Sequence, residues 1–485
     1  MLAEFAIGFI LFIICYSIFI NRIRGLPPGP VPLPLVGNLL SLSNEAAKDL
    51  LRLSKKYGPV LTVWMPQPVV VITDSKVLHE SIIRGGDTFG DRPQSSSHLI
   101  QMFDPYGAGW KEQRRFSFQS FKEVGFLGAE FRSLVSNYAQ EVILNWKRTA
   151  AKDELVDVTE CLQSAVSNVM WRLTFGRTRP MKDPFFKHIS EVTHRLSLSI
   201  IHPCVILSDA IPFLHRIDFL LGNPLKTAEN CRQEALEITK QELLRIESSC
   251  SEDEPTRCYV QAFLNEIEKR SPSGTSDGNF TRDQLLLSAT SHWIAGIETT
   301  VTTLRFGIHF LCRQPEVQRK MQEEIDERIG QREIFMEDQK HLPYCMATIL
   351  EIQRLANVGQ LNFFRLTNKD SVIGGHHIPA GSTILPQFPS VHVDSDVFDH
   401  ADELNPDRFL NDEGAFVKDP RVTPFSMGVR ACPGEGLAKM ELFLLLTSIT
   451  QHLTFSNPDS TPSKLLIDYG LTKSLEPFTV KITAR

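Results

Sequence analysis

The longest helical pattern in this 485-residue sequence runs from Gln284 to Arg313 and reads QLLLSATSHWIAGIETTVTTLRFGIHFLCR. At about 1.5 Å per residue, a helix over this segment is roughly 45 Å long, which is the width of a large domain. Such a helix must pass through the core of the domain that contains it. It therefore sets the scale of the fold, because the rest of the chain has to pack around it.

The patterns around this helix indicate the fold class. Helical periodicity recurs through the middle of the chain, and strand-like segments lie near the two ends. No alternation of strands and helices suggests a Rossmann sheet. We therefore predict a mainly α fold of the α+β class. The segments concerned are helices over 139–150, 235–249, 259–270 and 315–330, and strands over 60–65, 68–74 and 478–484.

The middle of the long helix, AGIETT (295–300), lowers its local stability. Glycine inside a helix costs about 1 kcal/mol, and threonine hydroxyls there compete for backbone carbonyls. One interpretation is close helix packing on Gly296 with solvated threonines. The other is a cofactor that lies flat against a locally opened helix, with Glu298 and Thr299 handling protons. The segment alone leaves both interpretations open.

A charged pair follows in TILEIQRLANV (348–358), where Glu351 and Arg354 are three residues apart and share a helix face. An isolated pair of this kind is usually a surface ion pair of little energetic weight. Arg408, in DELNPDRFL (402–410), could complete a buried network with the pair. Removing one partner from such a network would cost about 3–5 kcal/mol.

An anion-binding pattern occurs in GAGWKEQRRF (107–116). Trp110 and Arg114 are four residues apart, so on a helix the indole N–H and the guanidinium point the same way. The two groups are suited to binding one anionic group from one side.

A lone cysteine, Cys432, lies in PFSMGVRACPGEG (424–436) among glycines and prolines. A phosphate loop would need Gly-Lys-Ser/Thr, whereas Glu435 would repel phosphate. A zinc site lacks neighbouring ligands, and a cysteine nucleophile has no histidine within the stretch. A single thiolate before a helix, with Phe425 as cover and Arg430 as counter-charge, suits a fifth ligand to haem iron.

The N-terminus predicts a membrane anchor. Apolar residues from Leu2 to Ile20, interrupted by Glu4, form a segment of about 19 residues, roughly 28 Å as a helix and enough to cross a bilayer core. Arg22 and Arg24 follow it, so the positive-inside rule leaves the body of the protein in the cytoplasm. We expect an anchor over 2–20, a basic and proline-rich hinge over 21–34, and the body of the protein, the catalytic domain if the chain is an enzyme, over 35–485.

Composition limits the partners and the compartment. A net charge of -6 gives no polyanion-binding signal, so nucleic acid is excluded as an expected partner. The nine cysteines are scattered without C-x-x-C pairs, which fits a reducing compartment.

Taken together, these motifs resemble the cytochrome P450 family. FSMGVRACPG (425–434) matches the signature F-x-x-G-x-R-x-C-x-G at every specified position. AGIETT, E-x-x-R, NPDRF, W-x-x-x-R and the proline hinge occur in the family's order, so the resemblance covers essentially the whole chain. The anchor, the hinge and SVHVDSDVF (390–398) resemble animal microsomal members of the family-2-like clan.

The resemblance implies the cytochrome P450 fold, a large helical domain with a smaller β-rich N-terminal subdomain, preceded by one transmembrane helix. It also implies haem b as the cofactor and one role for each matching residue. The axial ligand would be Cys432, and Thr299 and Glu298 would relay protons. Ala295 and Gly296 would form the haem-facing floor of the substrate pocket. Trp110, Arg114 and Arg430 would hold the haem propionates, Phe425 would cover the thiolate, and Glu351, Arg354 and Arg408 would form a structural triad.

Two departures from the family pattern concern single residues. In many relatives an Arg or His after E-x-x-R binds a propionate, and here Arg365 stands one place off. A proline often found in SVHVDSDVF is replaced by Ser395, which affects a local turn.

The resemblance implies a monooxygenase in the endoplasmic reticulum membrane. Its electrons would come from NADPH through a separate NADPH–cytochrome P450 reductase, with cytochrome b5 as a second partner, because the sequence contains no flavin domain and no G-x-G-x-x-G. The segments that line the family's pocket are rich in Phe, Leu, Ile and Met, so we expect a lipophilic substrate, whether xenobiotic, fatty acid or steroid-like. The alternatives are a reductase-independent enzyme that rearranges peroxides and a haem-binding sensor without turnover.

Overall fold

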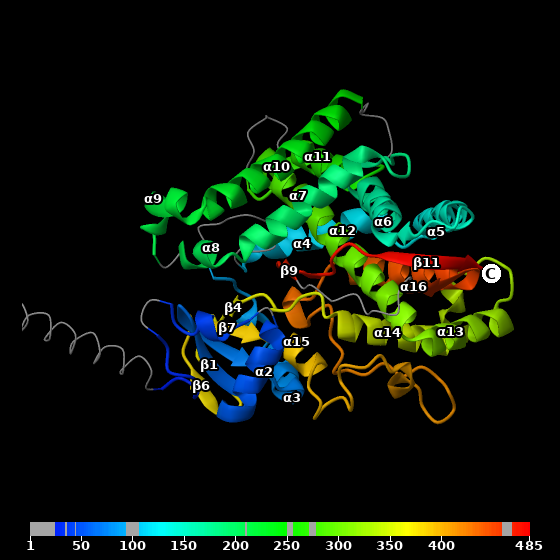
Figure 1. The fold of residues 1–485 in the computed structure, drawn as a ribbon. Helices are drawn as coiled ribbons and strands as arrows, with labels where there is room; N and C mark the ends of the chain where they lie inside the picture. The colour runs from blue at the N-terminus through cyan, green and yellow to red at the C-terminus, as the bar shows by residue number, and fades with distance from the viewer. Residues whose placement is uncertain are drawn as a thin grey trace, which may run out of the picture. The chain divides into compact units, whose positions relative to one another are not determined.

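The computed structural model describes residues 25–33, 36–43, 45–93, 106–208, 211–249, 256–270, 278–457 and 468–485. The chain forms two compact units, drawn in Figure 1. The smaller unit combines the chain up to Pro93 with Asn362–Val391, and the larger unit comprises Gln94–Leu361 and His392–Arg485.

The smaller unit is built on a mixed four-stranded sheet with the order β1-β2-β7-β4. Strand β1 pairs antiparallel with β2, β2 parallel with β7, and β7 antiparallel with β4. All six residues of β1 are buried, and α2 packs against this strand. The elements are α2 (Ala46–Tyr57), α3 (Ser75–Leu78), α15 (Phe388–His392), β1 (Val60–Met65), β2 (Gln67–Ile72), β4 (Arg365–Leu366), β5 (Ser371–Ile373), β6 (His376–Ile378) and β7 (Thr383–Pro386).

This unit corrects the expected β-rich N-terminal subdomain in one respect. Two of the four strands of the sheet, β7 and β4, come from a segment about 300 residues further along the chain. Parallel pairing needs a crossover connection, and here the connection includes the whole helical body up to Leu361. A short strand such as Thr383–Pro386 cannot be assigned to a distant sheet from its own sequence.

The described part of the predicted 21–34 hinge is hydrogen-bonded to β1. The amide of Thr62 donates to the Pro28 carbonyl at 2.9 Å, and the Thr62 hydroxyl donates to the Pro27 carbonyl at 2.8 Å. Prolines lack an amide hydrogen but keep their carbonyl, so Pro27 and Pro28 can only accept from the strand. The hinge is therefore attached to β1 near its middle.

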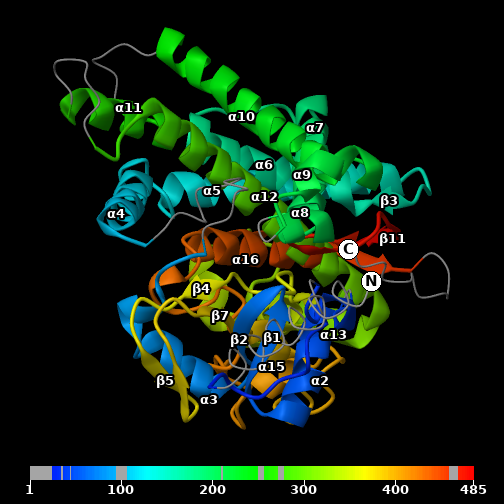
Figure 2. The same cartoon turned by 90° about the vertical axis from the view of Figure 1, so that its left-hand side faces the viewer.

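The larger unit is mainly helical, and α12 (Arg282–Arg313) crosses it, as Figures 1 and 2 show. Helices α6, α10, α14 and α16 pack against α12. The other helices are α4 (Ala108–Glu123), α5 (Ala129–Ala150), α6 (Val158–Phe175), α7 (Pro184–Ile200), α8 (Pro203–Ser208), α9 (Leu214–Ile217), α10 (Pro224–Ser249), α11 (Tyr259–Arg270), α13 (Pro315–Arg328), α14 (Pro343–Ala356) and α16 (Glu435–His452).

Two small sheets complete this unit. Strand β11 (Thr479–Ala484) lies between β3 (Val156–Asp157) and β8 (Leu453–Ser456), and β9 (Asp468–Tyr469) pairs with β10 (Lys473–Ser474). All of these pairs are antiparallel. The predicted mainly helical fold with small sheets is confirmed.

No helix among the described residues is long and apolar enough to cross a membrane. The predicted anchor over 2–20 lies outside the described residues, so the anchor stays a prediction.

The local sequence explains how α12 begins and why it can lie so close to α6. Thr281 caps the helix by accepting a hydrogen bond from the Gln284 amide. A Cβ atom built on Gly296 would lie 2.5 Å from the sulfur of Met170 on α6. A larger residue would require the Met170 side chain to move, so the close-packing interpretation of Gly296 is supported on the α6 side of the helix.

We predict that Gly296→Ala destabilises the protein by about 1–3 kcal/mol, because the new methyl group overlaps the buried Met170 side chain. Gly307→Ala in the same helix is the matched control. Its Cβ would meet Ile352 at an ordinary 3.4 Å, so the gain in helix propensity, up to about 1 kcal/mol, should dominate. Urea unfolding of the two variants measures the difference, and equal midpoints would contradict this account of the packing.

Candidate active site

Cys432 lies in a loop whose backbone is fixed on both sides. The Cys432 amide donates to the Phe425 carbonyl at 2.9 Å, and the Ala431 amide donates to the Gly428 carbonyl at 3.0 Å. Gly428 has a φ of 73°, in the left-handed region where a side chain would be strained. Helix α16 begins three residues after the cysteine, at Glu435. The loop thus presents one thiol at the N-terminus of a long helix.

Two opposing influences act on the Cys432 sulfur. Burial raises the pKa of the thiol, whereas the backbone amides of Gly434 and Glu435 donate hydrogen bonds to the sulfur and lower it. The nearby charge of Arg114 also lowers this pKa, and that of Glu435 raises it. The side chain nevertheless retains exposed surface. Protein atoms therefore surround a sulfur that still has open space on one side.

A group of cationic and aromatic side chains lies beside the cysteine. The Arg430 guanidinium stacks 4.0 Å from the ring centre of Trp110, and Arg114 lies 5.3 Å from the same centre. Arg114 also donates to the Ala431 carbonyl at 2.7 Å, next to the cysteine. Tyr106 contacts this group, with its ring centre 5.1 Å from that of Trp110. Sequence reasoning missed Tyr106, and only its position one turn before Trp110 could have indicated it.

The structure thus brings Arg430 to Trp110 and Arg114, which lie more than 300 residues earlier in the sequence. Burial lowers the pKa of Arg114, and the charge of Cys432 raises it. Arg430 is buried, and Arg114 is half-buried. The two guanidinium groups beside one thiol are suited to binding an anionic ligand.

The central helix provides a second open position. Thr299 is the only exposed residue between Ile297 and His309 on α12, and its hydroxyl donates to the Ala295 carbonyl at 2.7 Å. Protein atoms therefore do not cover the helix at this position, although its neighbours are buried. Ala295 and Gly296 are half-buried, and Glu298 is buried.

These observations test whether the residues fit a haem. Both Cys432 and Thr299 keep exposed surface inside the same compact unit. The thiol offers an iron ligand, and the two arginines match the two propionate carboxylates of a haem. The residues present therefore fit the cofactor.

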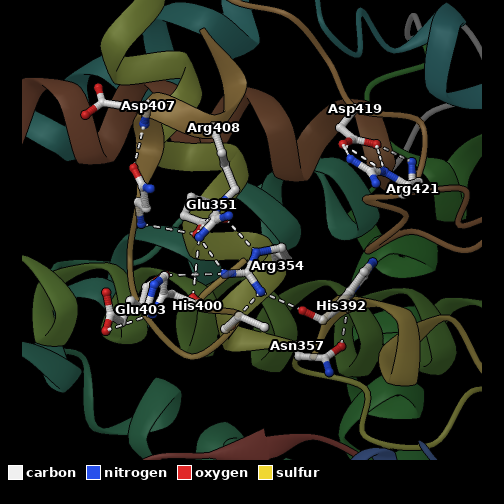
Figure 3. Close-up of polar contacts among 12 residues, drawn as sticks. Glu351, Arg354, Asn357, His392, His400, Glu403, Asp407, Arg408, Asp419 and Arg421 are labelled. Atoms are coloured by element: carbon white, nitrogen blue, oxygen red, sulfur yellow. Dashed lines mark hydrogen bonds and ion pairs between the residues drawn. The ribbon is translucent and has the colours of Figure 1, made fainter. Parts of the chain in front are cut away.

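A buried ion network lies between α14 and the stretch before the cysteine loop, as Figure 3 shows. Glu351 and Arg354 are joined by two hydrogen bonds of 2.6 and 2.7 Å, and both side chains are fully buried. Arg408, on the short helix Pro406–Phe409, donates to Glu351 at 2.9 Å. The structure therefore brings the three predicted members into one network.

Arg354 also holds the following chain segment in place. Its guanidinium donates to the carbonyls of His392 and Ala401 at 2.5 and 2.7 Å. Buried carbonyls need donors, and the guanidinium, with five N–H groups in a fixed fork, can satisfy several at once.

His392 extends this network to the cysteine loop and was missed by sequence reasoning. Its Nε2 accepts from the Thr423 amide at 2.9 Å, so the proton must be on Nδ1, which lies 3.2 Å from the Asn357 amide oxygen. Burial lowers the pKa of His392 to about 3 and keeps the ring neutral. Thr423 lies two residues before Phe425, whose carbonyl binds the Cys432 amide.

The remaining predicted residues have these positions. Phe425 is half-buried, and the Lys439 ammonium lies 5.7 Å from its ring centre. Arg365 is buried in strand β4 of the smaller unit, so its contact with a propionate stays a prediction. A further residue of α12, His292, packs against the rings of Tyr259 and Phe121, as a core histidine does.

Four features are typical of the class of haem-thiolate enzymes. They are a mainly helical fold, one cysteine at the start of a long helix, arginines beside it, and an acid–alcohol pair on the central helix. The sequence matches the cytochrome P450 family over residues 27–482. It is 33% identical over 482 residues to the Caenorhabditis elegans protein named "Probable cytochrome P450 CYP36A1", covering 96% of each chain. It is also 33% identical to cytochrome P450 2D10 of Mus musculus, covering 90% of this chain and 87% of the relative. The human cytochrome P450 2D6 is 33% identical as well, with coverage of 90% and 88%.

The chain therefore belongs to the cytochrome P450 family, and it is a monooxygenase with a haem-thiolate cofactor. The predicted resemblance to animal family-2-like members is confirmed.

We predict that His392→Ala weakens the attachment of the cysteine loop. The substitution leaves the buried Thr423 amide and the Asn357 oxygen without the ring, at a cost of about 1–3 kcal/mol. The reduced protein with carbon monoxide should lose its red-shifted, thiolate-type Soret band at a lower temperature than the parent.

His377→Ala is the matched control, because this histidine is exposed and lies 3.5 Å from only one surface carboxylate. The control should keep the parental transition. If His392→Ala also keeps it, His392 has no part in holding the loop.

Proposed function

We propose that this enzyme inserts one oxygen atom of O₂ into a lipophilic organic substrate and reduces the other atom to water. NADPH supplies two electrons and one proton, and a second proton comes from the medium, so the products are a hydroxylated substrate, water and NADP⁺. The observation that carries the proposal is the Cys432 thiol, held at the N-terminus of α16 beside the buried Arg430 and the half-buried Arg114.

We propose that the residues around the cysteine hold the cofactor. Cys432 would be the axial ligand, Phe425 its cover, and Trp110, Arg114 and Arg430 the partners of the propionates. When bound, haem b supplies the chemistry of oxygen activation, and the protein supplies position, charge and proton access. Arg365 would be a further propionate partner.

Glu298 and Thr299 would move protons on the substrate side of the cofactor. The Thr299 hydroxyl, with its hydrogen bond to the Ala295 carbonyl, lies on the open side of α12, and Glu298 precedes it. Ala295 and Gly296 would form the floor of the pocket. Intact Glu298 and Thr299 favour oxygen activation with external electrons over peroxide rearrangement.

The electron donor would be a separate flavoprotein, NADPH–cytochrome P450 reductase, with cytochrome b5 as a second donor. Three basic residues are candidates for contact with this donor, namely Arg115, Arg421 and Lys439. Arg421 is bound to Asp419 at 2.6 Å and Lys439 to Glu435 at 2.5 Å. In each of these two ion pairs the opposite charges largely cancel. Arg115, which is exposed, is the better candidate for a contact with an acidic surface.

The localisation we propose is the endoplasmic reticulum membrane, with a single-pass anchor over 2–20 and a cytoplasmic body. A second contact with the bilayer is supported by the segment 213–221 around α9. Four large apolar side chains there are exposed, namely Phe213 at 58%, Phe219 at 67%, Leu220 at 69% and Leu221 at 41%. Apolar side chains gathered in this way favour an apolar surface as their partner.

We predict that a chain lacking residues 1–24 still floats with phospholipid vesicles. Replacing Phe219 and Leu220 by serine should reduce that binding at least about tenfold, because each buried apolar side chain contributes about 1.5–3 kcal/mol. Leu144→Ser, at a side chain exposed on α5, is the matched control and should bind like the parent. Undiminished flotation of the double variant would refute the second contact.

We predict that Cys432→Ser abolishes the red-shifted Soret band of the reduced protein with carbon monoxide, because a hydroxyl is a much weaker iron ligand than a thiolate. Cys204→Ser is the control, since Cys204 is also free and partly exposed, on α8. This variant should keep the band. A histidine-type spectrum in the undenatured parent would refute the assignment of Cys432.

Turnover assays distinguish the three functions within the family. The proposed monooxygenase needs NADPH and reductase and yields an oxygenated product. A peroxide-rearranging enzyme turns over without either, and a sensor shows ligand-induced spectral shifts with no product. Mass spectrometry of products from a panel of lipids and drugs identifies the substrate.

A further inference from the structure

The cysteine loop contacts an aromatic pair formed by Tyr106 and Trp110. Tyr106 lies two residues before α4, and Trp110 lies in the first turn of this helix. Their ring centres are 5.1 Å apart, and the ring planes are inclined by 44°. Aromatic rings with centres about 4.5–7 Å apart attract each other when they are offset or inclined. The two side chains therefore form one aromatic surface beside the loop.

Arg430 contacts both rings of this pair. Its guanidinium carbon lies 4.0 Å from the ring centre of Trp110 and 5.7 Å from that of Tyr106. Arg430 is buried and ends the short helix Gly428–Arg430, two residues before Cys432. A guanidinium within about 6 Å of a ring centre is attracted by the ring, and more strongly where water is excluded. The aromatic pair therefore influences directly where this buried cation lies.

Each ring also contacts a cation from α4 itself. The Lys111 ammonium lies 4.7 Å from the ring centre of Tyr106, and the Arg114 guanidinium lies 5.3 Å from that of Trp110. Arg114 is in addition fixed by its hydrogen bond to the Ala431 carbonyl. Because Arg114 has these two contacts of its own, loss of the Tyr106 ring should chiefly affect Arg430.

We propose that Tyr106 is a positioning residue of the cofactor site, whose ring holds the Arg430 guanidinium in place to bind a haem propionate. A free arginine side chain has many rotamers, and ordering it when an anion binds lowers the affinity. A ring that already holds the guanidinium removes part of that cost, so the propionate meets a fork of fixed orientation. The inference rests on the proposed role of Arg430 and adds the residue that orients it.

The rate of haem release from the holoenzyme into an excess of apomyoglobin tests the proposal. Tyr106→Leu keeps an apolar side chain and removes the ring, so release should be about 2- to 30-fold faster, the range that one cation–π contact implies. Tyr106→Phe keeps the ring and should stay within about twofold of the parental rate. A parental rate in Tyr106→Leu, in protein that shows the thiolate-type Soret band, would overturn the proposal.

Tyr57→Leu is the matched control. The Tyr57 ring also carries a cation, because the Lys56 ammonium lies 5.1 Å from its centre at the end of α2. Tyr57 belongs to the smaller unit, whereas Tyr106 and Arg430 belong to the larger one. The control should release haem at the parental rate. Equal acceleration in both leucine variants would indicate a general loss of stability and would likewise overturn the positioning role.

A double-mutant cycle shows whether Tyr106 acts through Arg430. Arg430→Gln removes the cation, so in that background the Tyr106 ring has no guanidinium to hold. Adding Tyr106→Leu to Arg430→Gln should therefore accelerate haem release less than it does in the parent. The same acceleration in both backgrounds would show that the ring acts independently of Arg430, contrary to the proposal.

The midpoint potential of the haem iron is a second readout, which a merely structural role of the ring would not move. A guanidinium fixed beside a propionate offsets negative charge and so favours the reduced iron, which carries one positive charge fewer. Tyr106→Leu should therefore shift the potential to more negative values, and Tyr106→Phe should keep the parental value.

The same measurements separate this inference from the proposed function. A parent that lacks the thiolate-type Soret band would refute the proposed function itself. A parent that shows the band, with an unchanged potential and an unchanged release rate in Tyr106→Leu, would overturn only the role of Tyr106.

Discussion

The buried pair of Glu351 and Arg354 is the interaction on which the thiolate side of the enzyme depends. Two charges taken out of water are tolerated only when every donor and acceptor has a partner, and breaking one partner costs about 3–5 kcal/mol. Arg354 meets this condition by binding the carbonyls of His392 and Ala401. His392 in turn binds the Thr423 amide. The position of the Cys432 loop is thus linked to a charge on α14 through a short chain of hydrogen bonds.

The substrate side depends on a different constraint, the close approach of α12 and α6. Gly296 permits it, because Met170 occupies the space of a side chain. One interpretation of the sequence placed a flat cofactor against the helix at Gly296. The structure shows that Gly296 also packs against α6. The open position is one turn further on, at Thr299, whose hydroxyl binds a carbonyl of its own helix. One helix thereby combines a closed face and an open one.

The sequence predicted the elements whose patterns are local. The 259–270 helix has the observed bounds, the 284–313 helix begins two residues late, and β1 matches Val60–Met65. It gave no signal for α6, because 15 of its 18 residues are buried and no polar face sets a helical period. The motifs could be found because each needs a fixed spacing. His392 and Tyr106 could not be found in this way. The partner of the His392 ring lies 31 residues away, and Tyr106 contacts an aromatic ring without belonging to a motif of its own.

The two sides of the site differ in how many chain segments define them. The thiolate loop is tied to one continuous network around Glu351, where any change leaves a buried charge or amide without a partner. Three chain segments affect the pKa of Glu298, namely α7, the 471–472 turn and α12 itself. Helix α7 and this turn are joined by neutral hydrogen bonds between Ser197 and Thr472, which contribute about 0.5–1.5 kcal/mol each. Loss of one of these weaker bonds costs less than loss of a partner in the Glu351 network. The surroundings of Glu298 can therefore change at a lower cost in stability than the support of the Cys432 loop.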